Sequence, residues 1–179
     1  LELCRDIAHK FNNDFKKDIF PIPEPLIQKN ISRVMSLRDG RKKMSKSDES
    51  EYSRIDLKDS ADDIIKKIKK AKSDSFSIPD NLKDLEKKYE AFNLISIYSD
   101  LTDNTLEQSL NELQGKEYSY LKNKLSEILV ETICPVGKKI KDLLNDKSYL
   151  EKILKEGTEK AKNLAAHNLK EIKNAVGFL

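Results

Sequence analysis

Residues 31–48 have the sequence ISRVMSLRDGRKKMSKSD, and the character of the chain changes within this stretch. Residues 31–37 alternate apolar and polar side chains and include β-branched ones, a pattern that predicts a short strand. Residues 38–48 are polar and have no periodicity, which predicts a loop directly after the strand. Ligand-binding loops of open α/β sheets follow strands in this way, so we expect a binding loop here.

Apolar spacing predicts a helix before this stretch. Residues 1–17 form the candidate helix, and Pro21, Pro23 and Pro25 prevent regular structure in the segment after it. The chain begins with Leu1, already inside the helical pattern. We therefore expect its natural start to lie further upstream.

Beyond the loop, three capping boxes divide a helical sequence into separate helices. Each box pairs a Ser or Thr with an acidic or amide side chain three residues later: Ser60 with Asp63, Thr105 with Gln108, and Ser148 with Glu151. Gly115 and Gly177 are placed to end the second and third of these helices. The sequence therefore predicts a mostly α-helical chain.

These patterns predict two parts. Residues 1–57 are interpreted as the C-terminal part of a Rossmann-like α/β nucleotide domain, containing a helix, a short strand and the loop. Residues 58–179 are interpreted as a helical C-terminal domain. Hydrophobic residues make up 37% of the chain and charged residues 36%, which favours amphipathic helices over a thick sheet core.

Charge and apolar runs exclude some partners. The 34 basic and 31 acidic residues leave a net charge of +3, so overall charge does not indicate nucleic acid. No apolar run approaches the roughly 20 residues that span a bilayer, and we expect a soluble protein without a membrane partner. Cys4 and Cys134 lie far apart without a neighbouring His pair, and His9 and His167 are isolated. We therefore expect no protein-bound metal and no disulfide framework.

The loop carries the strongest chemical signal. Lys43 and Lys46 place two ammonium groups three residues apart, with Met44, Ser45 and Ser47 around them. Lysines are flexible point charges suited to phosphate oxygens that move during a reaction, and hydroxyls can bond the same oxygens. These residues favour a nucleotide triphosphate as substrate. A localisation signal or a solvated basic patch is the alternative interpretation.

The sequence Lys-Met-Ser-Lys-Ser resembles the second signature of class I aminoacyl-tRNA synthetases. Other segments resemble the tryptophanyl family: LELCRDIA at 1–8, PIPE at 21–24, RVMSL at 33–37, NLISIYS at 93–99, GKEY at 115–118, VETICP at 130–135 and EGTEKA at 156–161. The chain departs from the family in having Ile31 and Ser32 in place of a small-residue pair, and Gly40 where proline is frequent. Lys46 favours the bacterial or organellar branch of the family.

The resemblance implies an enzyme that joins tryptophan to ATP as an adenylate and then transfers the aminoacyl group to tRNA(Trp). It implies a homodimer in the bacterial cytoplasm or an organelle matrix, with residues 58–179 binding tRNA and Mg²⁺ held mainly through ATP phosphates. The first signature and the tryptophan pocket of the family lie upstream of Leu1. The chain alone is therefore expected to be inactive.

The resemblance also implies roles for individual loop residues. Lys43 and Lys46 would act as catalytic residues by holding the departing phosphates. The expected ATP-binding residues are Val34, Met35, Lys43, Met44, Ser45, Lys46 and Ser47, with Val34 and Met35 at the adenine.

Two alternatives remain open from the residues. The signature does not select the amino acid, so a tyrosyl or glutamyl synthetase is possible. The second alternative is a non-catalytic basic helical module that binds nucleic acid. The lysines that favour this module are Lys66, Lys67, Lys69, Lys70 and Lys72, although a solvated helix face is the simpler interpretation of them.

Overall fold

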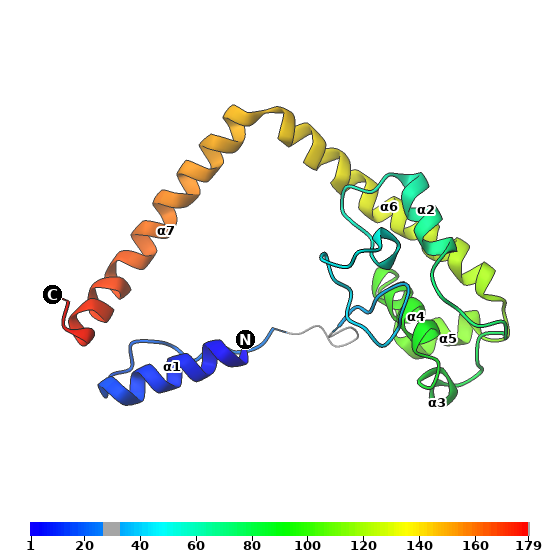
Figure 1. Cartoon of the computed structure of the whole chain (residues 1–179), viewed down its shortest axis with the longest axis horizontal. Coiled ribbons are helices and arrows are strands. Elements are labelled where there is room, and N and C mark those ends of the chain that lie inside the picture. The colour runs from blue at the N-terminus through cyan, green and yellow to red at the C-terminus, as the bar shows by residue number, and fades with distance from the viewer. Residues whose placement is uncertain (27–32, 179) are drawn as a thin grey trace. The chain divides into compact units, whose positions relative to one another are not determined.

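A computed structural model describes residues 1–26 and 33–178 of the chain. Contacts divide it into two units, Leu1–Ile27 with Leu143–Leu179, and Gln28–Asp142. Helices dominate, as predicted (Figure 1). Their bounds are α1 Glu2–Phe15, the 3₁₀ helix η1 Glu51–Ser53, α2 Ala61–Lys69, α3 Leu82–Leu85, α4 Tyr89–Leu101, α5 Leu106–Leu113, α6 Tyr118–Asn145 and α7 Lys147–Val176.

The short strand predicted at residues 31–37 is not formed in the described part of the chain. An isolated antiparallel bridge between Met35 and Lys43 takes its place. Ile31 and Ser32 lie outside the described residues. A strand requires a ladder of bonds to a neighbour along its length, and alternation in the sequence cannot supply that neighbour. This element of the prediction was therefore wrong.

Two of the three predicted capping boxes are formed. Ser60 with Asp63 begins α2, and Thr105 with Gln108 begins α5. The third is wrong, because the cap of α7 is Asp146, whose side chain accepts from the N–H of Tyr149 at 3.0 Å. Aspartate is one of the best N-cap residues, and here it begins the helix earlier than predicted. The two predicted glycine ends, Gly115 at φ 70° and Gly177 at φ 81°, both have left-handed backbone.

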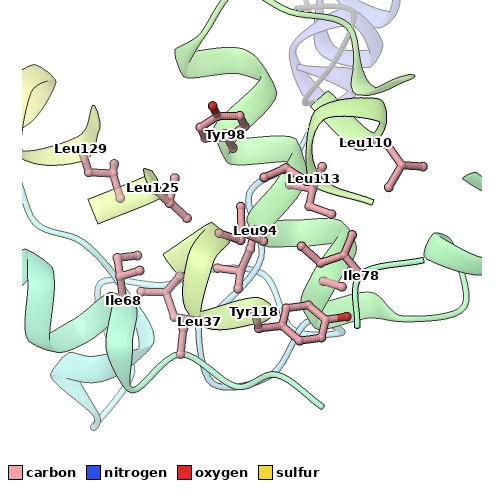
Figure 2. Close-up of a cluster of buried hydrophobic side chains, with 14 of the residues drawn as sticks. Leu37, Ile68, Ile78, Leu94, Tyr98, Leu110, Leu113, Tyr118, Leu125 and Leu129 are labelled. Carbon is pink, nitrogen blue, oxygen red and sulfur yellow. The ribbon is translucent and has the colours of Figure 1, made fainter. Parts of the chain in front are cut away.

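The core of unit Gln28–Asp142 joins the helices to the predicted binding loop. Figure 2 shows the cluster, in which Leu94 of α4, Leu113 of α5 and Leu125 of α6 are buried together with Leu37. Leu37 immediately precedes the loop and is only 2% exposed. The loop thus begins at a core residue. The predicted domain boundary after residue 57 falls inside this unit and stays a prediction.

Helix α6 reaches the segment after the loop through a glycine. A Cβ added at Gly137 would lie 2.6 Å from the carbonyl oxygen of Leu57, a distance that forces one of the two backbones to move. In contrast, a Cβ at Gly157 in α7 meets nothing within 4 Å. Glycine therefore permits the close approach of α6 to Leu57, and Gly157 has no such role.

This difference gives a matched pair of substitutions. Gly137→Ala should lower the free energy of unfolding by about 1–3 kcal/mol, since it overpacks a backbone contact. Gly157→Ala should raise the helicity and stability of α7, by about 1 kcal/mol at most, because alanine has the higher helix propensity. Urea unfolding and circular dichroism measure both. Equal effects of the two substitutions would contradict the close contact at Leu57.

Candidate functional site

The residues around the predicted loop form a tight turn that we call the signature hairpin, residues 34–44. The Ser36 N–H donates to the carbonyl of Lys42 at 2.8 Å, and the Met44 N–H donates to the carbonyl of Val34 at 3.1 Å. The two arms of the hairpin are thereby paired on each side of the Met35–Lys43 bridge. Its turn is closed by a bond from Lys42 N–H to the Asp39 carbonyl at 3.0 Å.

The hairpin is anchored to the protein at Leu37 and at its turn. The Leu37 N–H donates to the carbonyl of Ser53 at 2.9 Å, and the Leu37 carbonyl accepts from the Lys72 N–H at 2.8 Å. At the turn, a Cβ on Gly40 would lie 2.6 Å from the backbone carbon of Tyr89, so α4 packs directly on the glycine. The absence of a side chain at Gly40 therefore permits this close contact with α4.

The segment after the hairpin is exposed and internally bonded. The Oγ atoms of Ser45 and Ser47 are 2.9 Å apart, and the Ser47 N–H donates to Ser45 Oγ at 3.3 Å. Lys43 and Lys46 have exposed side chains, and within residues 33–178 neither forms an ion pair. Both ammonium groups are therefore available to an anionic ligand.

A hollow of about 840 Å³ opens beside the hairpin. It brings together five of the seven predicted ATP-binding residues, namely Val34, Lys43, Met44, Ser45 and Lys46. Met35 and Ser47 are not among its lining residues. The remaining lining residues are Arg33, Arg54, Ile55, Asp56, Leu57, Lys58, Asp59 and Ile140. Most of the predicted ATP-binding residues therefore lie on one surface. The basic residues on it are Arg33, Lys43, Lys46, Arg54 and Lys58.

Sequence patterns did not identify Arg54 as part of this surface. Its guanidinium donates to the carbonyl of Asp48 at 3.1 Å and to Asp56 Oδ2 at 3.2 Å. Arg54 therefore ties the end of the exposed segment to Asp56, which lines the hollow. A lone arginine outside any motif gives no sequence signal, since only its distance to these groups reveals the role.

The five lysines proposed for nucleic acid have different surroundings. Lys67 is buried and paired with Asp59 at 2.6 Å, and Lys72 pairs with Glu90 at 2.9 Å. Lys70 lies over the ring of Tyr52 at 4.2 Å. They do not form one solvated face, and three of them already have partners inside the chain.

Among the described residues, no group of three His, Cys, Asp or Glu side chains is arranged to hold a metal ion. None of the helices in the described part of the chain has the length and apolar content to cross a membrane.

The hairpin, its exposed lysines and the helical core agree with one protein family. A model described as tRNA synthetases class I (W and Y) matches residues 1–134, and the chain belongs to this family. More particularly, it is similar to tryptophan–tRNA ligases. It is 49% identical to that of Caulobacter vibrioides and 46% identical to that of Rickettsia conorii, covering 99% and 100% of this chain.

These alignments cover 52% and 54% of the two relatives, so the chain spans about half the length of the curated relatives it matches. Among solved structures, a tryptophanyl-tRNA synthetase from Mycoplasma pneumoniae superposes with a TM-score of 0.76 at 28% identity. That superposition covers 98% of this chain and 54% of the other. The resemblance expected from the loop and its flanking segments is confirmed.

Proposed function

We propose that this chain is part of a tryptophan–tRNA ligase and contributes the surface that holds the triphosphate of ATP. The observation that carries the proposal is the hollow in which Lys43 and Lys46 lie with Val34 and Met44. The Val34 side chain, suited to an adenine ring, and two exposed ammonium groups suited to phosphates then lie on one surface. The Met35 backbone is not part of this surface, because Asn93 bonds both its N–H and its carbonyl. The similarity to tryptophan–tRNA ligases supports tryptophan as the amino acid.

In the proposed reaction, the carboxylate of tryptophan attacks the α-phosphorus of ATP. The bond from that phosphorus to the bridging oxygen breaks, and pyrophosphate leaves with the negative charge. Lys43 and Lys46 stabilise this charge, and Ser45 and Ser47 donate hydrogen bonds to the same oxygens or hold the segment. Mg²⁺ arrives with ATP and is held chiefly by phosphates and water.

The second step transfers the tryptophanyl group to tRNA(Trp). We assign tRNA binding to the helical part, residues 58–179, in a homodimer located in the bacterial cytoplasm or an organelle matrix. The glutamyl alternative loses support because the matching family is described for W and Y. The basic-module alternative loses support because Lys67 and Lys72 are paired within the chain.

The 179-residue chain by itself should not form tryptophanyl adenylate. Adenylation requires the amino acid, the α-phosphorus and the leaving group to be oriented together, and the chain spans only 52% of its Caulobacter relative. Tryptophan-dependent exchange of pyrophosphate into ATP measures the reaction. The purified chain should give no exchange above a blank without protein, whereas the complete enzyme should. Exchange by the isolated chain would contradict the claim that adenylation needs groups outside these 179 residues.

A further inference from the structure

The backbone of Met35 is held by a side chain from a distant part of the sequence. Asn93 lies in α4, 58 residues further along the chain, and is only 4% exposed. Its Oδ1 accepts a hydrogen bond from the Met35 N–H at 3.0 Å, and its Nδ2 donates one to the Met35 carbonyl at 2.9 Å. One carboxamide thus binds both backbone polar groups of a single residue.

The geometry of the signature hairpin explains why these two groups are available. The residues on either side of Met35 are hydrogen-bonded to the other arm of the hairpin. In antiparallel pairing, successive residues direct their N–H and C=O groups to alternate edges, so those of Met35 face away from Lys43. The amide of Asn93 occupies that outer edge, where a further strand would otherwise bond.

The support behind Asn93 is rigid. Its neighbours Leu94 and Ile95 are 1% and 0% exposed and belong to the hydrophobic core (Figure 2 labels Leu94). A buried amide with both ends bonded has little freedom to rotate, because each lost bond leaves a polar group without a partner. Helix α4 therefore fixes the position of Met35 along the hairpin.

We propose that Asn93 is a positioning residue for ATP, an inference that rests on the proposed function. By holding Met35, it sets the register of the opposite arm, which carries Lys43 and Met44 into the hollow. A slip of one residue in such pairing turns every side chain to the other face. Asn93 is not among the residues that line the hollow, so it acts through the backbone of the hairpin.

The test uses Asn93→Leu in the complete enzyme, with steady-state pyrophosphate exchange at varied ATP and varied tryptophan. The kcat/KM for ATP should fall on the order of 10²-fold, the loss expected when catalytic groups are misplaced by about an ångström. The KM for tryptophan should stay at the wild-type value, because the hairpin carries the ATP contacts.

The control is Leu113→Ala, which removes packing from the same hydrophobic core but on α5 rather than on the helix that carries Asn93. It should lower the melting temperature at least as much as Asn93→Leu while leaving the ATP kinetics unchanged. If Asn93→Leu does not fold, Asn93→Asp takes its place. That substitution keeps an acceptor for the Met35 N–H, loses the donor to the carbonyl, and should weaken ATP use selectively.

Three results would overturn the proposal. They are wild-type ATP kinetics in the folded Asn93 variant, an equal ATP defect in Leu113→Ala, or a parallel loss for ATP and tryptophan. A wild-type enzyme without tryptophan-dependent exchange would instead contradict the proposed function. The two failures are therefore distinguishable in one set of measurements.

Discussion

Lys46→Ala in the complete enzyme should slow adenylate formation by about 10²-fold or more, as expected when one preorganised contact to developing charge is lost. Lys46 lies on the hollow with Lys43 and has an exposed side chain. The substitution therefore removes a positive charge from the hollow and leaves the packing of the hydrophobic core unchanged. Tryptophan affinity and the melting temperature should stay close to wild type. Single-turnover adenylation, measured beside both quantities, separates these effects.

Two further substitutions make the result specific. Lys46→Arg should restore only part of the rate, because a planar guanidinium differs from an ammonium in reach and geometry. Lys42→Ala removes an exposed lysine four residues earlier, in the signature hairpin. Lys42 does not line the hollow, so this variant should keep a rate near wild type. An unchanged chemical step in Lys46→Ala would remove this residue from the mechanism. A large fall in melting temperature would give it a structural role instead.

Lys67→Ala should lower the free energy of unfolding by about 3–5 kcal/mol, because it breaks a buried ion pair and leaves the carboxylate without its partner. The side chains of Lys67 and Asp59 are 7% and 12% exposed, and Nζ lies 2.6 Å from Oδ2. The same Oδ2 accepts the N–H of Asp56 at 2.9 Å, and Lys67 is 3.9 Å from the Asp56 carboxylate. One ammonium therefore faces two carboxylates, both on residues that line the hollow.

The neighbouring lysine provides the control for this loss of stability. Lys66 is exposed on the same helix, so Lys66→Ala should change the free energy of unfolding by about 0.5 kcal/mol at most. Urea unfolding of the two variants and the wild type measures the difference. A Lys67→Ala variant as stable as Lys66→Ala would show that the buried pair contributes nothing to the fold.

The features predicted correctly from the sequence depend on short-range chemistry. The capping box of α2 needs only Ser60 and Asp63, three residues apart, and the left-handed end of α7 needs only Gly177. The exposed loop likewise follows from a polar stretch without periodicity. Lys43 and Lys46 were proposed to bind phosphate in the same way, because they lie within one short motif, and this role stays a prediction.

Features that depend on distant residues were missed. The strand at residues 31–37 required a neighbour, and the partners observed for Met35 are Lys43 and the side chain of Asn93, 58 residues away. The burial of Lys67, in contrast, could have been predicted from the sequence. It follows Ile64 by three residues and precedes Ile68, both fully buried, so helical spacing places it on the core face of α2. Lys67 was grouped with four other lysines by charge alone, so its place on the core face was missed.

Amino-acid-dependent pyrophosphate exchange by the complete enzyme tests the central claim most directly. Tryptophan, tyrosine and glutamate should be compared at saturating ATP in the wild type and in the Lys43→Ala/Lys46→Ala double variant. The account predicts exchange with tryptophan alone, and its near-complete loss in the double variant with tryptophan binding retained. Exchange with tyrosine or glutamate, or full tryptophan-dependent exchange without both lysines, would contradict it.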